Sequence, residues 1–144
     1  KSKILSKFPE IIHGFTTREL GADDTRIADE LKIPVSSIVT VKQVHSNQVL
    51  FLSDRSDRSI EADAIITNQK EIFIAIRTAD CVPILVYDPE HRAVGAIHAG
   101  WRGLVSGVIE NAVCEMAVHF GTKPPKLLAA LGPALCPGCF AVRR

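Results

Sequence analysis

Two short apolar runs with a turn between them dominate the middle of the chain. Residues 84–87 and 93–97 are apolar, and the segment 88–91 between them is rich in turn-forming residues. This pattern predicts a strand, a turn and a second strand. If the two strands pair as a hairpin, Cys81 and His98 lie at the same end of the sheet, although they are far apart in sequence.

Apolar positions at helical spacing predict the clearest helix over residues 104–120. Gly121 is a candidate to end this helix, and the prolines at 124 and 125 forbid its continuation. A shorter helix is predicted over residues 23–31, with Asp24 as its N-cap.

The remaining apolar segments are typical of strands, because they alternate or are rich in β-branched residues. Strands are predicted at 37–44, 49–52, 63–67, 72–76 and 126–131, with a short strand that runs into a polar turn within 11–18 and a polar surface loop at 54–59. Many strands with few helices indicate a mixed α/β fold, of the α+β kind. No repeat or linker interrupts the 144 residues, so we expect one domain over residues 1–144.

Composition and charge narrow the function classes. Hydrophobic residues make up 47% and charged residues 23%, as in ordinary globular proteins, and a net charge of +1 gives no support for a nucleic-acid partner. No apolar run is long enough to span a membrane, and the N-terminal residues do not resemble a signal peptide. Four cysteines at irregular spacing do not form a secreted disulfide framework. We therefore expect a cytoplasmic protein with neither a nucleic acid nor a membrane as its partner.

Three side chains that can hold a metal ion are predicted at strand ends. His45 lies in a predicted tight turn at 45–47, Cys81 just before a strand and His98 at the end of one. Zn²⁺ takes such sets, and three protein ligands leave one position for water or substrate. The same pattern also fits two hydrogen-bonded histidines and a buried thiol. In a further alternative, Cys81 is a nucleophile and His98 its base.

Neighbouring residues are candidates for supporting roles. Asp80 can orient a ligand through a hydrogen bond, or it can simply cap the turn. The glycine-rich turn at Gly100 opens a helix, which suits anion binding, and Arg102 is a candidate to stabilise developing charge. Arg18, which follows Thr17 at a strand end, can hold an anion. For both arginines a solvated or packing role is the alternative.

Copper chemistry is disfavoured by the sequence. A blue-copper centre also uses two histidines and one cysteine, but its axial ligand is usually methionine. The only methionine, Met116, lies on the apolar face of the predicted helix. A multicopper centre needs more imidazoles than five histidines comfortably supply, and the chain has no His-x-His pair.

The segment Cys136-Pro137-Gly138-Cys139 has the spacing of redox and zinc CxxC motifs. Too few residues follow it for a thioredoxin-type helix, and no second cysteine pair is present to complete a zinc site. A Gly/Pro turn that carries two thiols is therefore the favoured interpretation.

Several stretches together resemble the YfiH-type laccase-domain family, also called the multicopper polyphenol oxidase-like or purine nucleoside phosphorylase family. The matching stretches are HGFTTR (13–18), QVH (43–45), EADA (61–64), TADCVP (78–83), HAGWRG (98–103) and GPA (132–134). They cover nearly the whole chain, and the two central stretches are highly specific.

The resemblance implies that His45, Cys81 and His98 are zinc ligands and that Arg18 belongs to the phosphate or substrate pocket. It implies a four-layer α/β/β/α sandwich of the cysteine-hydrolase-like type. The implied activities are phosphorolysis of adenosine, inosine, guanosine and methylthioadenosine, and deamination of adenosine. Two alternatives are a Cys-His amidohydrolase that acts on peptidoglycan precursors and a non-catalytic zinc-stabilised scaffold. Because family members are longer at the C-terminus, we expect this chain to be truncated there.

Overall fold

The structure is a computed structural model, and it describes residues 1–54, 60–136, 138 and 139. The helices are α1 (Asp24–Leu31), α2 (Trp101–Val105) and α3 (Val108–Phe120), with short 3-10 turns at Leu5–Lys7, Val35–Ser37 and Pro124–Lys126. The strands are β1 (Ile38–Thr40), β2 (Val49–Phe51), β3 (Ala64–Thr67), β4 (Phe73–Ala75), β5 (Val82–Asp88), β6 (Ala93–Ala99) and β7 (Leu128–Leu131). Most of the loop predicted at 54–59 lies outside the described residues.

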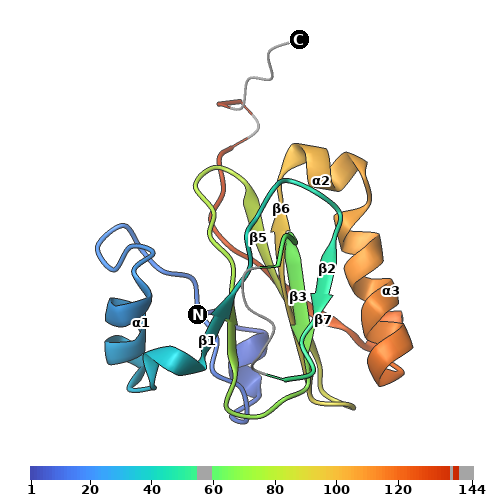
Figure 1. The fold of residues 1–144 in the computed structure, drawn as a ribbon, viewed down its shortest axis with the longest axis horizontal. Coiled ribbons are helices and arrows are strands. Elements are labelled where there is room, and N and C mark those ends of the chain that lie inside the picture. Colours follow the sequence, from blue (N-terminus) through green and yellow to red (C-terminus); the bar gives the residue numbers. More distant parts are fainter. Residues whose placement is uncertain (55–59, 137, 140–144) are drawn as a thin grey trace.

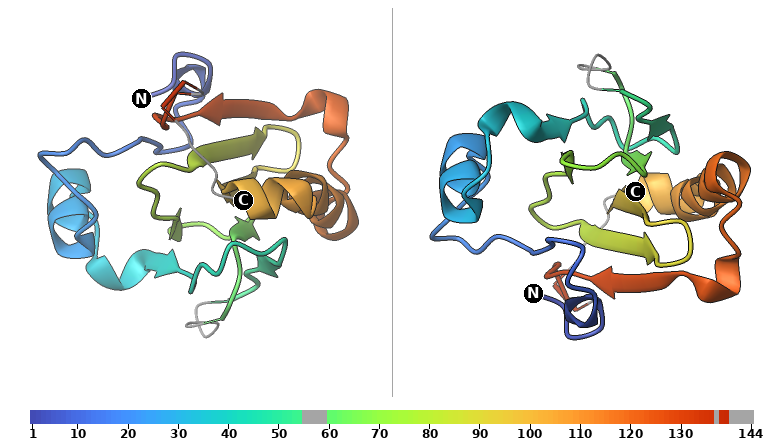
Figure 2. Two further views of the ribbon diagram at one scale, coloured as in Figure 1. Left: turned by 90° about the horizontal axis from the view of Figure 1, so that it is seen from above. Right: turned by 90° about the horizontal axis from the view of Figure 1, so that it is seen from below.

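A five-stranded sheet forms the centre of the molecule, in the order β2-β3-β6-β5-β7. β2 and β3 run parallel, and the other neighbouring pairs are antiparallel. β1 and β4 form a separate parallel pair. Figure 1 shows α2 and α3 on one side of the large sheet and β1 with α1 on the other. The views from above and below in Figure 2 show the same arrangement. The predicted mixed α/β class is confirmed.

The predicted hairpin is present, and it is longer than the two apolar runs. β5 and β6 pair antiparallel from Val82↔Ala99 to Asp88↔Ala93. Cys81 directly precedes β5 and His98 is the second-last residue of β6, so the two side chains belong to the same end of the sheet. This juxtaposition, which the sequence predicted, is the basis of the candidate site.

Both faces of the central strands are buried. Ile84 and Val86 pack in the core beneath α3, which also contains Met116. The alternate residue Tyr87 packs on the opposite face with Leu5 from the N-terminal segment. Because both faces are covered, β5 is a nearly continuous apolar run rather than an alternating one.

A second core lies between the small β1–β4 pair and the large sheet. Val39 of β1 and Ile65 of β3 are buried there together with Leu50 and Leu52. Ile74 of β4 packs against the same cluster. This packing fixes both ends of the connection from β1 to β2, which carries His45.

The prediction of one helix over 104–120 is wrong. The structure has two helices, because Gly107 lies in the left-handed region at φ 85° and ends the helical path after Ser106. The first of these helices, α2, already begins at Trp101. In α1 the N-cap is Asp23 instead of Asp24, since Asp23 Oδ1 accepts hydrogen bonds from the N–H groups of residues 25 and 26.

Two predicted strands also differ from the structure. Residues 11–17 form no strand; Ile11 and Phe15 instead pack against the core around Tyr87. The strand predicted at 37–44 ends at Thr40. Beyond it Lys42 forms an isolated bridge with Glu61, and the backbone N–H of Val44 donates to the Asp63 carboxylate. Ile12 and Val44 are exposed, so the apolar pattern overstated both the burial and the strand pairing of these segments.

Within the described residues, no helix is both long enough and apolar enough to cross a membrane. The longest, α3, has 13 residues, whereas a spanning helix needs about 20.

Candidate metal site

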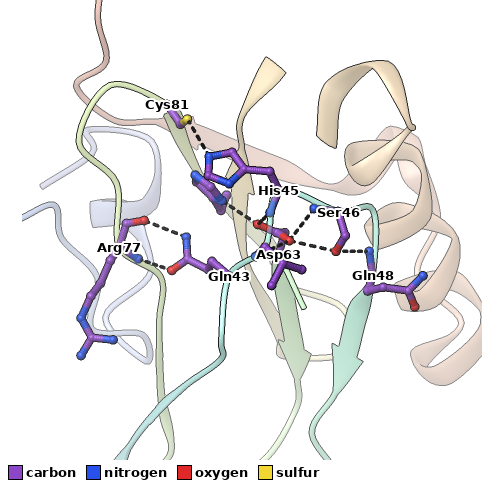
Figure 3. Close-up of polar contacts among 9 residues, drawn as sticks. Gln43, His45, Ser46, Gln48, Asp63, Arg77 and Cys81 are labelled. Atoms are coloured by element: carbon purple, nitrogen blue, oxygen red, sulfur yellow. Dashed lines mark hydrogen bonds and ion pairs between the residues drawn. The ribbon is translucent and has the colours of Figure 1, made fainter. Parts of the chain in front are cut away.

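Three segments bring the side chains of His45, Cys81 and His98 together at one end of the large sheet. Figure 3 shows the His45 ring beside the Cys81 sulfur. Their ligand atoms all lie within 4.8 Å of one another. Cys81 Sγ is 3.9 Å from His45 Nε2, and the two imidazole rings meet edge to face with their centroids 4.8 Å apart. His98 is buried, Cys81 half-buried and His45 exposed, so the group faces solvent on one side.

Asp63 holds the two histidines of this group in place through hydrogen bonds. Its carboxylate is fully buried and accepts hydrogen bonds from both histidine segments (Figure 3). The donors are Val44 N at 3.2 Å, His45 N at 3.0 Å, Ser46 N at 2.7 Å, Ser46 Oγ at 2.9 Å and His98 Nδ1 at 2.7 Å. One carboxylate therefore fixes the backbone of the His45 turn and the ring of His98 at the same time.

The Asp63 carboxylate remains charged in this environment. Burial acts to raise the pKa of Asp63, but the hydrogen bonds from His98, Ser46 and Val44 outweigh it and hold the pKa below its ordinary value. Because Nδ1 of His98 faces this carboxylate, its Nε2 is the ring nitrogen left for a ligand. A carboxylate behind a histidine is the usual support of a metal-binding imidazole.

The backbone of the His45 turn is also special. His45 has φ 61°, a left-handed conformation that few residues other than glycine adopt. This conformation lets three successive N–H groups converge on Asp63, as in other anion-binding turns. The side-chain amide of Asn47 donates to the backbone carbonyl of Ser106 at 2.8 Å. The backbone carbonyl of Asn47 accepts from the side-chain amide of Asn111 at 3.1 Å. The turn is thus joined to the junction of α2 and α3.

Gly100 and Gly103 let α2 approach the ligands closely. A Cβ atom at Gly100 would lie 2.8 Å from His45 Cδ2 and 3.2 Å from Cys81 Sγ. A Cβ at Gly103 would lie 2.9 Å from the carbonyl oxygen of Ser46. Both positions are buried. The structure therefore gives these glycines a packing role, in addition to the anion-binding role expected from the sequence.

A cavity of about 400 Å³ opens beside the two histidines. It is lined by Val41, Gln43, His45, Arg77, Thr78, Ala79 and His98. Gln43 closes one wall, because its amide donates to the carbonyl of Arg77 and accepts from the N–H of Arg77, both at 2.7 Å. The Arg77 guanidinium in turn pairs with Asp24 of α1 at 2.7 Å. A cavity of this size lies within the range of small-molecule sites.

The donor set and the charges fit a cation. A tetrahedral zinc ion separates a sulfur and a nitrogen ligand by roughly 3.6 Å, close to the 3.9 Å between Cys81 Sγ and His45 Nε2. Burial, Asp80 and Asp63 raise the pKa of the Cys81 thiol. This is the reverse of what a free nucleophilic thiolate requires, whereas a bound cation stabilises the thiolate.

Four residues that the sequence predicted to support the His45, Cys81 and His98 group have exposed side chains. Asp80 is exposed, and its side chain forms no hydrogen bond within the described part of the chain. Arg102 is also exposed, and its guanidinium lies 4.7 Å from the ring centroid of Trp101. Thr17 and Arg18 lie in the exposed segment before α1, where the carbonyl of Thr17 accepts from Gly21. Among the described residues, these four side chains form no hydrogen bond or ion pair with the ligand group, and only Asp80 acts on it, through its charge beside Cys81.

Sequence reasoning missed three residues that hold the site: Asp63, Gln43 and Asn47. All three act through backbone groups of distant segments, which no local pattern reveals. Two signals were available. Gln43 and Asp63 lie in the stretches QVH (43–45) and EADA (61–64) that resemble the family, and Asp63 directly precedes a fully buried strand, where a carboxylate needs hydrogen-bond donors.

Known proteins resemble this chain in sequence and in fold. A purine nucleoside phosphorylase of Bacteroides thetaiotaomicron is 36% identical over 127 residues, which cover 82% of this chain and 44% of that protein. The crystal structure of YfiH from Bacillus licheniformis superimposes with a TM-score of 0.74 at 31% identity, and covers 81% of this chain and 47% of that one. YlmD from Geobacillus stearothermophilus gives a TM-score of 0.75 at 29% identity, over 86% and 52% of the two chains.

The chain spans about half the length of these relatives. A family model matches residues 13 to 144 of this chain. The chain therefore belongs to the family described as multi-copper polyphenol oxidoreductase laccase, in agreement with the YfiH-type laccase-domain resemblance seen in its sequence.

Proposed function

We propose that this protein is a zinc-dependent purine nucleoside phosphorylase, with His45, Cys81 and His98 as the metal ligands. The relatives named purine nucleoside phosphorylase support the reaction class. The proposed substrates are phosphate with adenosine, inosine, guanosine or methylthioadenosine. Adenosine deamination is proposed as a second activity of the same site.

One observation carries the proposal: three ligand atoms lie within 4.8 Å of one another, and two of the three residues, His45 and His98, line a cavity of about 400 Å³. Among the described residues, no fourth histidine, cysteine or carboxylate joins the group. Three protein ligands and an open side are typical of catalytic zinc, whereas structural zinc is usually closed by a fourth ligand. This difference favours an enzyme over a zinc-stabilised scaffold.

Zinc is favoured over copper by the surroundings. Met116, the only methionine, is fully buried in the core beneath α3 and belongs to the large apolar cluster. It is therefore not available as the axial ligand of a blue-copper centre. A polyphenol oxidase activity has no support of this kind beyond the family description.

In the proposed phosphorolysis, a phosphate oxygen attacks the anomeric carbon of the ribose, and the bond from that carbon to the purine nitrogen breaks. The products are the sugar 1-phosphate and the free base, which takes up a proton from phosphate or solvent. A bound zinc ion would supply Lewis-acid polarisation of a substrate group. Asp63 holds the ring of His98 and the backbone of His45 in place throughout, so that little reorganisation is needed.

The remaining assignments belong to the same proposal. Arg18 and Thr17, with the turn at Gly100, bind phosphate; Arg102 stabilises developing charge; Asp80 moves or shares a proton. A cytoplasmic location is supported by four cysteines that all carry free thiols. The four-layer sandwich of the cysteine-hydrolase-like type stays a prediction.

The test is to measure zinc per chain and phosphate-dependent release of hypoxanthine from inosine in the wild type and in Cys81→Ala, His45→Ala and His98→Ala. Each variant removes one of three ligands, so we expect zinc and activity to be lost together. Arg18→Ala is expected to keep its zinc and to raise the KM for phosphate more than that for inosine, because arginine binds phosphate through paired hydrogen bonds.

The same experiment separates the alternatives. If Cys81 is the nucleophile of an amidohydrolase, Cys81→Ala keeps one zinc per chain and loses only turnover. Thiol alkylation is then fast in the wild type, whereas a coordinated thiolate is protected until a chelator removes the metal. If the wild type binds zinc but cleaves no nucleoside, the result favours the non-catalytic zinc-stabilised scaffold.

A further inference from the structure

The CxxC segment is a feature that the proposed function does not use. Cys136 and Cys139 are both exposed, and both carry free thiols. The N–H of Cys139 donates to the carbonyl of Cys136 at 3.0 Å, which closes a turn of four residues. This bond agrees with the expected turn, of which Pro137 lies outside the described residues, and the two sulfur atoms are 2.9 Å from one another. Two free thiols in contact need little movement to form a disulfide.

The contact makes the two thiols unequal. The contact between the two sulfur atoms lowers the pKa of the Cys136 thiol and raises the pKa of the Cys139 thiol. The thiolate is the reactive form of a cysteine. Cys136 is therefore suited to react first with an external disulfide, and Cys139 lies in position to resolve the product. Because both side chains are exposed, a small disulfide can reach them.

We propose that Cys136 and Cys139 form a redox-active dithiol that exchanges with low-molecular-weight disulfides such as glutathione disulfide. The Cys136 thiolate attacks one sulfur of glutathione disulfide, which releases one glutathione thiolate and leaves a mixed disulfide on Cys136. Cys139 then loses its proton, attacks the Cys136 sulfur and releases the second glutathione. The protein dithiol is oxidised by two electrons, and one glutathione disulfide is reduced to two glutathione molecules.

The dithiol directly follows a segment that runs beside the Cys81 loop. The N–H of Leu135 donates to the carbonyl of Asp80 at 3.1 Å, and the N–H of Gly132 donates to the carbonyl of Pro83 at 2.8 Å. The backbone on both sides of Cys81 is thus tied to the segment that leads into the dithiol. A disulfide between Cys136 and Cys139 would form directly beside the hydrogen bond between Leu135 and Asp80. The exchange reaction itself does not depend on the proposed phosphorylase activity.

The test is to incubate the purified chain in glutathione buffers of increasing disulfide content, quench with acid, alkylate the remaining thiols and locate them by mass spectrometry. We expect Cys136 and Cys139 to lose alkylation together and to retain no glutathione. Cys114, an exposed thiol on α3, is the matched control. It should remain alkylated at a glutathione ratio at which the pair has closed, because only the pair gains from its high effective concentration.

Two variants test the assigned order of attack. Cys139→Ser is expected to hold glutathione on Cys136 as a stable mixed disulfide, because the resolving thiol is absent. Cys136→Ser is expected to react more slowly. Wild-type protein that retains glutathione on both cysteines, or in which both stay alkylated to the same extent as Cys114, would overturn the proposal. Circular dichroism of the variants confirms that their fold is intact, as the exposure of both side chains leads us to expect.

Discussion

At the scale of single residues, Asp63 is the side chain on which the candidate site most depends. Its buried carboxylate serves five donors from two segments. Asp63→Asn replaces one acceptor oxygen by a donor, so buried donors lose their partners. We expect zinc affinity to fall by about 10- to 100-fold and the metal-free protein to lose about 1–3 kcal/mol of stability. Chelator competition and urea unfolding without metal measure the two effects.

Asp80→Asn is the matched control for this prediction. Its side chain is exposed and makes no hydrogen bond within the described residues, so its metal-free unfolding midpoint should stay close to that of the wild type. Equal unfolding midpoints for Asp63→Asn and Asp80→Asn would contradict the organising role of Asp63.

Gly100 is the second residue with a sharp prediction. An added Cβ would meet His45 Cδ2 at 2.8 Å and Cys81 Sγ at 3.2 Å, so Gly100→Ala must displace a ligand or α2. We expect a loss of about 1–3 kcal/mol and lower zinc occupancy. Gly14→Ala is the control, because a Cβ there has no atom within 4 Å. If both variants bind zinc as the wild type does, the close approach of α2 is not needed.

At the scale of elements, the junction between α2 and α3 links the helices to the His45 turn. Gly107 has φ 85°, a conformation that costs a residue with a Cβ about 1–2 kcal/mol. Gly107→Ala should therefore lower the free energy of unfolding by about this amount, as measured in urea. Gly107→Asn should lose less, since asparagine tolerates the left-handed region. If the two variants lose the same free energy of unfolding, the loss comes from side-chain contacts and not from the backbone conformation of residue 107.

The sequence predicted the elements that depend on local pattern. The β5–β6 hairpin follows from two apolar runs around a turn, and it places Cys81 and His98 at one end of the sheet. The break at Gly107 was missed because Ile109, Ala112 and Met116 continue the helical spacing beyond it. The carboxylate behind the ligands was missed for another reason. Asp63 binds residues 44–46 and 98, and such partners are fixed by the sheet register rather than by neighbours in sequence.

At the scale of the whole molecule, Tyr87 ties the N-terminal segment to the far end of the sheet. It is the only tyrosine; it is fully buried, and its hydroxyl donates to Glu10 at 2.7 Å. Burial, together with the hydrogen bond to Glu10, raises its pKa to about 12. In the unfolded chain, the tyrosine hydroxyl has its ordinary pKa of about 10. This contribution to stability is therefore complete below about pH 10 and is lost as the pH rises through the folded value.

A spectroscopic titration checks this directly, because a single tyrosine gives a single phenolate absorbance signal. We expect a midpoint of about 12 in the native protein and of about 10 in concentrated denaturant. Glu10→Gln should lower the native midpoint, since it removes the negative charge beside the hydroxyl. A native midpoint that equals the denatured one would show that the N-terminal segment does not cover Tyr87.

The origin of the three ligands in separate segments has a kinetic consequence. Cys81 and His98 flank a hairpin, and hairpins close within about 1–10 μs. His45 reaches them only once β2 has paired in parallel with β3, a pairing that closes a longer loop and is therefore slower. During folding, a metal ion bound at the proposed site would thus meet two of its ligands before the third. Uptake of the ion with full affinity then reports that the sheet is complete, and not merely that its central hairpin has formed.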